Sequence, residues 1–208
     1  MIGERLKELL NEEDLVHRPL PIEGSIRESL VILEESTGQQ YRFGMPGPEF
    51  QKKEWEQFLQ ELSTIEPSPD YLVASGSLPP GVPADFFAQV ARVGKNKGAK
   101  TIIDASGEAL EKAIQEGVYL IKPNVREFRE LVGEDITEES QIKAEAQKMV
   151  RSAQCEVLVI SLGAAGNFIL LKGTMDDDKP FCSFEKGVSH CLFKSNEKIL
   201  SFIRTPRE

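Results

Sequence analysis

Lys122, Asn124 and Glu127 lie close together in the segment IKPNVRE and are residue types that can handle phosphate and a divalent cation. Asn124 followed three residues later by Glu127 matches a capping box, which would simply begin a helix. The alternative is that Lys122 contacts a phosphate while Glu127 orders waters on Mg²⁺, which prefers carboxylates and retained waters. From this segment alone, capping is the simpler interpretation.

A second candidate is the loop in VLVISLGAAGNFIL, where two apolar runs flank a stretch of small residues. Its free backbone N–H groups are suited to a nucleotide, but such a loop can equally be a plain turn. It lacks the Lys-Ser/Thr ending of a Walker-type phosphate loop. The candidate nucleotide-binding residues here are Ser161, Gly163, Ala164 and Gly166.

Three further places carry polar residues that fit a ligand site. Ser75 and Gly76 begin SGSLPPG, where hydroxyls and a close backbone approach can serve a ligand, or a rigid turn can lead into the next helix. Asp104 follows a short apolar run, and we interpret it by itself as a helix cap. Arg27, in GSIRESL, can grip a phosphate bidentately, although a single Arg is more often a solvated surface residue.

The elements that must position these residues follow from hydrophobic periodicity. A helix is expected near Leu6–Leu10, and two strands with a Gly-containing turn are expected over 29–43. A second helix is expected with an apolar face that includes Phe50, Trp55, Phe58, Leu59 and Leu62. Apolar strands then alternate with amphipathic helices, which predicts an α/β fold with a parallel sheet covered on both faces. The expected strands are 71–74, 101–103, 119–121 and 157–160, and the expected helices 84–95, 108–115, 125–131 and 138–152. In an open parallel sheet the ligand site lies beyond the carboxyl ends of the strands, where most of the candidates fall.

Composition limits the classes of function. The 208 residues are 40% hydrophobic with a formal net charge of −9, which suits one soluble domain and argues against a nucleic-acid partner. Three cysteines without CxxC spacing and two histidines leave the chain with few soft ligands for a zinc site. The N-terminal residues have no apolar signal region, and no run of about eighteen apolar residues follows, so we expect a cytoplasmic protein without a membrane partner.

Five segments of the chain form a recognisable set: STGQQYRFGMPGP (36–48), LVASGSLPPGVP (72–83), IIDASGEAL (102–110), LIKPNVREFREL (120–131) and LVISLGAAG (158–166). Together and in this order they resemble the ribokinase-like PfkB carbohydrate kinases, in particular the phosphofructokinase-2 and 1-phosphofructokinase branch. The resemblance covers residues 1–172 and implies a three-layer α/β fold with a small β lid, formed here by strands within 30–43.

The resemblance implies roles for the candidates. Arg27 would grip the phosphate of a sugar phosphate, although Ser29 stands where the family usually has Asn, and Ser75 and Gly76 would also face the sugar. ATP would lie along the strand ends, with Lys122 and Asn124 near its phosphates and the 161–166 loop along the nucleotide. Glu127 would hold Mg²⁺ through water. The lid strands would also form the interface of a homodimer.

The sequence also departs from the family pattern. Family members carry an Asp-bearing first strand and a Gly-Gly-x-x-x-Asn segment before the region matched here, and neither is present. Gly-Ala-Gly-Asp, which supplies the family's anion hole and catalytic base, occurs nowhere in the chain, so no catalytic residue is assigned. Residues 173–208 are expected to form a divergent tail, with a short element near 198–203.

Three functions remain open from the sequence. The first is an ATP-dependent kinase homologue acting on a fructose phosphate or related ketose phosphate, impaired or inactive as this chain. The second is a non-catalytic nucleotide-binding or interaction fragment, a pseudokinase. The third is a nucleoside kinase of the same fold.

Overall fold

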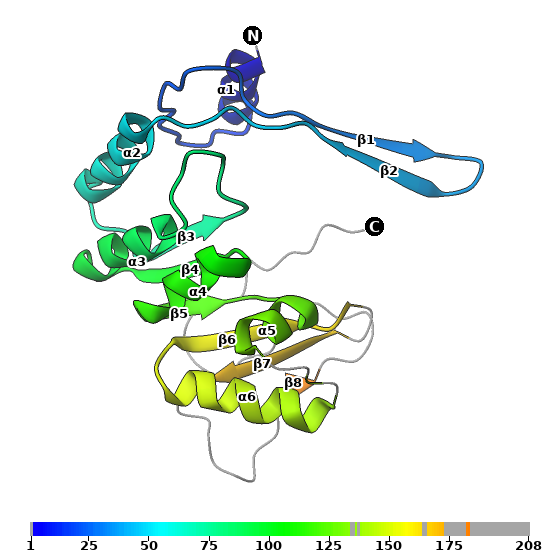
Figure 1. The fold of residues 1–208 in the computed structure, drawn as a ribbon. Helices are drawn as coiled ribbons and strands as arrows, with labels where there is room; N and C mark the ends of the chain where they lie inside the picture. Colours follow the sequence, from blue (N-terminus) through cyan, green and yellow to red (C-terminus); the bar gives the residue numbers. More distant parts are fainter. Residues whose placement is uncertain (1, 134–135, 137, 164–165, 173–181, 184–208) are drawn as a thin grey trace.

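The fold was analysed in a computed structural model that describes residues 2–133, 136, 138–163, 166–172 and 182–183 (Figure 1). An N-terminal helix and a two-stranded hairpin precede a larger sheet with its connecting helices. In chain order the elements are α1 (Ile2–Glu12), β1 (Ser29–Glu34), β2 (Gln39–Gly44), α2 (Lys52–Thr64), β3 (Tyr71–Ser75), α3 (Phe86–Asn96), β4 (Lys100–Asp104), α4 (Gly107–Gln115), β5 (Val118–Ile121), α5 (Val125–Val132), α6 (Glu139–Arg151), β6 (Cys155–Ser161), β7 (Asn167–Leu171) and β8 (Cys182–Ser183).

Strands β1 and β2 form the hairpin that the sequence predicts. They pair antiparallel from Ser29 opposite Gly44 to Glu34 opposite Gln39. Gly38 has φ +70° at the turn, a conformation that glycine adopts without strain, and Thr37 Oγ1 donates to Glu34 Oε2 at 2.8 Å. The hairpin projects away from the larger sheet (Figure 1).

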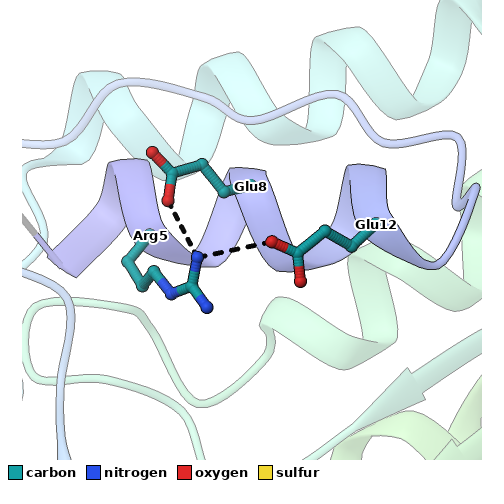
Figure 2. Close-up of polar contacts among 3 residues, drawn as sticks. All are labelled: Arg5, Glu8 and Glu12. Carbon is teal, nitrogen blue, oxygen red and sulfur yellow. Dashed lines mark hydrogen bonds and ion pairs between the residues drawn. The ribbon is translucent and has the colours of Figure 1, made fainter.

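Helix α1 carries ion pairs along its own exposed surface. Arg5 Nη1 lies 3.0 Å from Glu8 Oε2 and 3.4 Å from Glu12 Oε1, so one guanidinium bridges two carboxylates along the helix (Figure 2). None of the residues of α1 is buried. Since all three side chains are largely exposed, these ion pairs contribute little to stability.

The larger sheet confirms the predicted α/β class. Its strand order is β3-β4-β5-β6-β7-β8, and β3 to β6 pair parallel in the order in which they occur in the chain. Strands β7 and β8 are antiparallel to their neighbours. The predicted parallel sheet therefore ends at β6, because the five residues 162–166 are too few for a parallel crossover and form a hairpin connection instead.

Helices cover one face of this sheet among the described residues, whereas the sequence led us to expect cover on both. Neighbouring parallel strands that follow one another across a sheet with right-handed crossovers place every connecting helix on the same side. Figure 1 shows α3, α4, α5 and α6 on that side. The main core lies between them and the sheet, with Ile103, Ile121 and Phe128 fully buried. A smaller apolar cluster on the sheet contains Leu120, Val157, Val159 and Ile169.

Two contacts fasten the segment after the hairpin to the rest of the chain. The carboxylate of Glu54, at the start of α2, accepts from the backbone N–H of Gln51 at 2.6 Å and of Glu23 at 2.5 Å. These two donors lower the pKa of the Glu54 carboxyl, because they favour its charged form. Farther along, Phe50 N–H donates to the carbonyl of Pro80 at 2.8 Å, next to Gly81. The segment between β2 and α2 is thereby joined to the loop that follows β3.

Among the helices that the structure describes, none has the length and apolar character needed to cross a membrane. The predicted divergent tail, 173–208, lies outside the described residues except for Cys182 and Ser183. The short element expected near 198–203 is likewise outside them.

Candidate active site at the strand ends

The carboxyl ends of β3 to β6 bring most of the candidate residues to one edge of the sheet. Gly76 N–H donates to the carbonyl of Asp104 at 2.9 Å, which joins the end of β3 to the end of β4. Ser161 N–H donates to the carbonyl of Pro123 at 2.9 Å, which joins β6 to the segment after β5. The parallel register of the sheet thus sets the relative positions of these loops.

The N-terminus of α5 shows the capping arrangement that the sequence indicates. Asn124 Oδ1 accepts from Glu127 N–H at 2.9 Å, and Glu127 Oε2 accepts from Asn124 N–H at 2.8 Å. In the described part of the chain, Glu127 Oε1 has no hydrogen bond. The backbone N–H groups of Val125 and Arg126, in the first turn of α5, have none either. Capping and anion binding are therefore compatible here, since a helix N-terminus attracts negative charge.

Lys122 provides positive charge beside this helix end. It is half-buried and immediately follows β5, and within the described residues it makes no ion pair or hydrogen bond. Because no carboxylate among the described residues pairs with Lys122, its positive charge is available to a bound anion.

Backbone hydrogen bonds join the described residues on both sides of the loop after β6. Leu162 N–H donates to the carbonyl of Gly166 at 2.8 Å, and Gly166 N–H to that of Gly163 at 3.1 Å. Gly163 has φ +61° and no heavy atom within 4 Å of the position that a Cβ would take. Ala164, also a candidate, lies outside the described residues. Ser161 immediately precedes this loop, and its backbone N–H donates to the carbonyl of Pro123.

Ser75, Gly76 and Asp104 lie together at the ends of β3 and β4. Ser75 Oγ donates to Asp104 Oδ2 at 3.4 Å, a long hydrogen bond. Gly76 has φ +104° with open space at its Cβ position. The sequence favours a helix cap for Asp104, but Ser106 is the N-cap of α4, and Asp104 ends β4 and accepts from Ser75 Oγ. This position fits the other sequence interpretation, that Asp104 at a strand end acts on a ligand.

Arg27 is separate from this group. It is exposed and lies beside the segment that leaves β2, with its Nη2 3.3 Å from the position of a Cβ on Gly44. Within the described residues it has no bond to Ser75 or Gly76. The structure therefore associates Arg27 with the hairpin base rather than with the strand ends.

Other reactive groups in the described part of the chain do not suggest a different chemistry. Burial raises the pKa of the Cys155 thiol to about 12, so this cysteine is protonated and unreactive at neutral pH. Three or more His, Cys, Asp or Glu side chains do not gather anywhere among the described residues in a way that could hold a metal ion.

The sequence profile described as pfkB family carbohydrate kinase matches residues 1–176. This chain belongs to the pfkB family. It is 42% identical over 164 residues to ATP-dependent 6-phosphofructokinase isozyme 2 of Mycobacterium tuberculosis, covering 79% of this chain and 48% of the relative. It is 36% identical over 165 residues to the isozyme of the same name from Escherichia coli K12, covering 79% of this chain and 53% of the relative. A tagatose-6-phosphate kinase from Staphylococcus epidermidis is 32% identical over 170 residues, which are 80% of this chain and 54% of that enzyme.

Solved structures of the family share the fold. The crystal structure of E. coli phosphofructokinase-2 in complex with fructose-6-phosphate matches with a TM-score of 0.78 at 35% identity, covering 83% of this chain and 57% of that one. The tetrameric inhibited form of the same enzyme matches with a TM-score of 0.77 at 34% identity, again over 83% of this chain and 57% of that one. The predicted ribokinase-like α/β fold is confirmed. The chain spans about half the length of the curated relatives it matches.

Proposed function

We propose that this pfkB-family chain provides the ATP side of a sugar-phosphate kinase, binding the phosphates of ATP at the carboxyl ends of β5 and β6. The observation that carries the proposal is the convergence of Lys122, the open N-terminus of α5 and the turn at Gly163 on one edge of the sheet. The named relatives are kinases that act on phosphorylated hexoses, which supports the same reaction class.

The ATP phosphates would meet two kinds of positive group. The free N–H groups of Val125 and Arg126 point out of the first turn of α5, where the helix dipole favours an anion. Lys122 adds a full charge that no carboxylate among the described residues neutralises. Asn124 holds the helix start in place through its cap. The residues present therefore fit a bound polyphosphate.

Glu127 is suited to a hydrated Mg²⁺. One of its carboxylate oxygens caps the helix, which fixes the side chain, while the other stays available toward the strand ends. Mg²⁺ usually retains several waters and uses one or two carboxylates together with substrate phosphates. When bound, the ion would neutralise charge on the phosphates, and Glu127 would orient its waters.

The sugar phosphate would lie at the carboxyl ends of β3 and β4, beside the ATP residues at the ends of β5 and β6. Ser75 presents a hydroxyl there, Gly76 has open space at its Cβ position, and Arg27 would reach the sugar's phosphate from the segment before β1. A fructose phosphate or a tagatose phosphate is the proposed acceptor, in keeping with the relatives. Movement of the hairpin toward the strand ends would be needed to bring Arg27 to the sugar.

A second candidate, nucleotide binding without turnover, is favoured by one observation. The sequence contains no Gly-Ala-Gly-Asp, the segment expected to supply the anion hole and the base. Phosphoryl transfer depends on positioning and on stabilising charge around the transferred group, and a positioned base typically contributes about 10²–10⁴-fold in rate. ATP binding would survive this loss, whereas transfer would not.

Calorimetric titration of the purified chain with Mg-ATP, together with a coupled kinase assay on fructose 6-phosphate and tagatose 6-phosphate, tests both candidates. Lys122→Ala is expected to weaken ATP binding by about tenfold or more, because a charge-assisted contact is lost. The control is Lys95→Ala, which removes a lysine charge from the last turn of α3. That turn leads into the start of β4, at the ends of the strands opposite to the candidate site.

The outcomes separate the alternatives. Turnover above background establishes the kinase, and ATP binding without turnover establishes the second candidate. Equal ATP affinities of Lys122→Ala and the unchanged chain would reject the assigned phosphate site.

We further propose that two copies associate through the hairpin. On one face, two cross-strand pairs, Leu30 with Phe43 and Ile32 with Tyr41, expose apolar side chains, and the pair of Glu34 and Gln39 lies beside them at the turn. An exposed apolar face of this kind is typical of an interface. The E. coli relative is named in a tetrameric form, which supports self-association within the family.

A further inference from the structure

Strands β1 and β2 belong to a longer stretch of chain, residues 24–50, whose two ends meet at one side chain. We call this stretch the hairpin segment. Glu23 lies just before it and Gln51 just after it. The backbone N–H of Glu23 donates to Glu54 Oε1 at 2.5 Å, and that of Gln51 donates to Glu54 Oε2 at 2.6 Å. One carboxylate therefore holds both ends of the hairpin segment.

Capping of α2 accounts for only one of these two bonds. Gln51 is the N-cap of α2 and Glu54 its third residue, so the bond between them is part of a capping box. The other oxygen accepts from Glu23, which is 31 residues earlier in the chain. Among the described residues Glu54 is the one charged residue that is buried, with 8% of its surface exposed. Since a buried carboxylate is costly unless its oxygens accept hydrogen bonds, both bonds are needed.

The hairpin segment is also packed against itself near its ends. Met45 N–H donates to the carbonyl of Glu28 at 3.2 Å, which joins the chain after β2 to the chain before β1. Nearer to Glu54, the position of a Cβ on Gly24 lies 3.1 Å from Pro48 Cβ. Because these contacts lie within the hairpin segment, we expect it to move as one body about the ends that Glu54 holds.

Arg27 lies in this segment, four residues after Glu23. An extended chain spans at most about 3.3–3.6 Å per residue, so the backbone of Arg27 stays within about 14 Å of Glu23. At the other end of the segment, Phe50 N–H donates to the carbonyl of Pro80, in the loop that follows Ser75. The two ends therefore set where Arg27 can lie relative to the loop after β3.

We propose that Glu54 is a positioning residue for sugar-phosphate binding, because it holds both ends of the hairpin segment and so keeps Arg27 near the loop after β3. This inference rests on the proposed function, in which Arg27 grips the phosphate of the sugar and Ser75 and Gly76 face the sugar. Glu54 itself touches neither substrate. Restricting the positions open to Arg27 reduces the conformational entropy that is lost when the ligand binds.

The role requires a carboxylate, because both of its partners are donors. An ionised Glu accepts at both oxygens, whereas Gln has one accepting oxygen and one NH₂ group. Glu54→Gln therefore keeps the size of the side chain but leaves one backbone N–H facing a donor. The matched control is Lys53→Ala. It removes the ion pair of 2.6 Å between Lys53 Nζ and Glu23 Oε1, which is largely exposed, and leaves both bonds of Glu54 in place.

The first test compares two ligands on the full chain, by NMR titration of isotope-labelled protein with fructose 6-phosphate and, separately, with Mg-ATP. Glu54→Gln should weaken fructose 6-phosphate binding about tenfold and leave Mg-ATP affinity unchanged, because the ends of β5 and β6 lie outside the hairpin segment. Lys53→Ala should change neither affinity. In an Arg27→Ala background, Glu54→Gln should weaken fructose 6-phosphate binding no further, because it acts through Arg27.

The second test needs no ligand. Hydrogen exchange should be faster in Glu54→Gln at the amide of Glu23, which loses its acceptor. It should also be faster at Phe50, whose amide donates to the loop after β3 and not to Glu54. The amide of Met45, inside the hairpin segment, should exchange as in the unchanged chain.

Several results would overturn the proposal. These are unchanged exchange at Glu23 and Phe50 in Glu54→Gln, an unchanged affinity for fructose 6-phosphate, equal losses for both ligands, and a further loss in the Arg27→Ala background. If the unchanged chain binds no fructose 6-phosphate, the proposed sugar site fails, and the exchange comparison alone decides whether Glu54 holds the two ends. If Glu54→Gln does not fold, Glu54→Asp takes its place, because it keeps the charge on a side chain one methylene shorter.

Discussion

The N-terminal part of the chain, which comprises α1, β1 and β2, has apolar residues at helix and strand spacing, as the larger sheet and its helices do. The two parts differ in how far these residues are buried. Helix α1 has no buried residue, and every residue of β1 and β2 except Glu34 is exposed. In the core, by contrast, Ile103, Ile121, Leu158 and Phe128 are fully buried between helices and sheet. Periodicity therefore predicts which element forms, whereas burial depends on whether another layer of the chain covers it.

This contrast also separates stability from function. The core fixes the strand ends at which the candidate ATP residues lie, and it does so through buried contacts that tolerate little change. The hairpin side chains are exposed, and we expect them to contribute little to folding. The Phe50–Pro80 and Glu54–Glu23 bonds are where the two parts meet.

The largest expected difference comes from removing an aromatic ring in each part. Phe128→Ala should lower the free energy of unfolding by about 3–5 kcal/mol, because it opens a cavity in the closed core. Phe43→Ala in the hairpin should change it by less than about 0.5 kcal/mol, since that ring is about half exposed. Urea unfolding of both variants measures the difference. Equal losses would mean that the hairpin is part of the cooperative core.

Two glycines with positive φ test the junction between the parts. Gly81 has φ +84°, and a Cβ there would collide with the carbonyl of Phe50, whereas Gly38, with φ +70°, has free space around it. Alanine at Gly38 should cost about 1–2 kcal/mol from the backbone conformation alone. Gly81→Ala should cost distinctly more and separate the hairpin base from the loop after β3. Similar unfolding free energies for the two variants would show that the Phe50 contact is not rigid.

The two faces of the hairpin distinguish an interface from ordinary surface. Ile32→Lys places a charge among the apolar side chains Leu30, Tyr41 and Phe43, and Leu33→Lys places one on the face that also carries Gln40 and Arg42. If copies associate through the apolar face, Ile32→Lys should weaken association about tenfold or more, and Leu33→Lys should act less. Analytical ultracentrifugation over a range of concentrations measures this. A chain that stays monomeric throughout would contradict the proposed association.

Much of the fold was predictable because local patterns and the fold agree. The helices and strands between Lys52 and Ser161 lie within two residues of the expected bounds, and the IKPNVRE segment begins α5 with the predicted capping box. The antiparallel direction of β7 was also available from the sequence, since the connection after Ser161 has only five residues. We did not use this signal.

Other features could not be predicted because they depend on contacts between distant residues. Nothing near Gly81 in the sequence indicates that Phe50 packs against it, and nothing near Glu23 indicates a bond to Glu54. Asp104 was interpreted as a cap because its neighbours are capping residues, and only the pairing of β3 with β4 brings Ser75 to it. The candidate roles of Arg27, Lys122 and Glu127 remain predictions that binding experiments must test.

The smallest expected effect lies in α1. Arg5→Ala removes both ion pairs drawn in Figure 2, but the three side chains are 59–62% exposed, so solvent and salt screen their attraction. The free energy of unfolding should fall by no more than about 0.5–1 kcal/mol, and less in high salt. Thermal unfolding at low and high ionic strength measures this. A larger loss that salt does not reduce would mean that Arg5 acts through packing, and that α1 belongs energetically with the core rather than with the exposed N-terminal part.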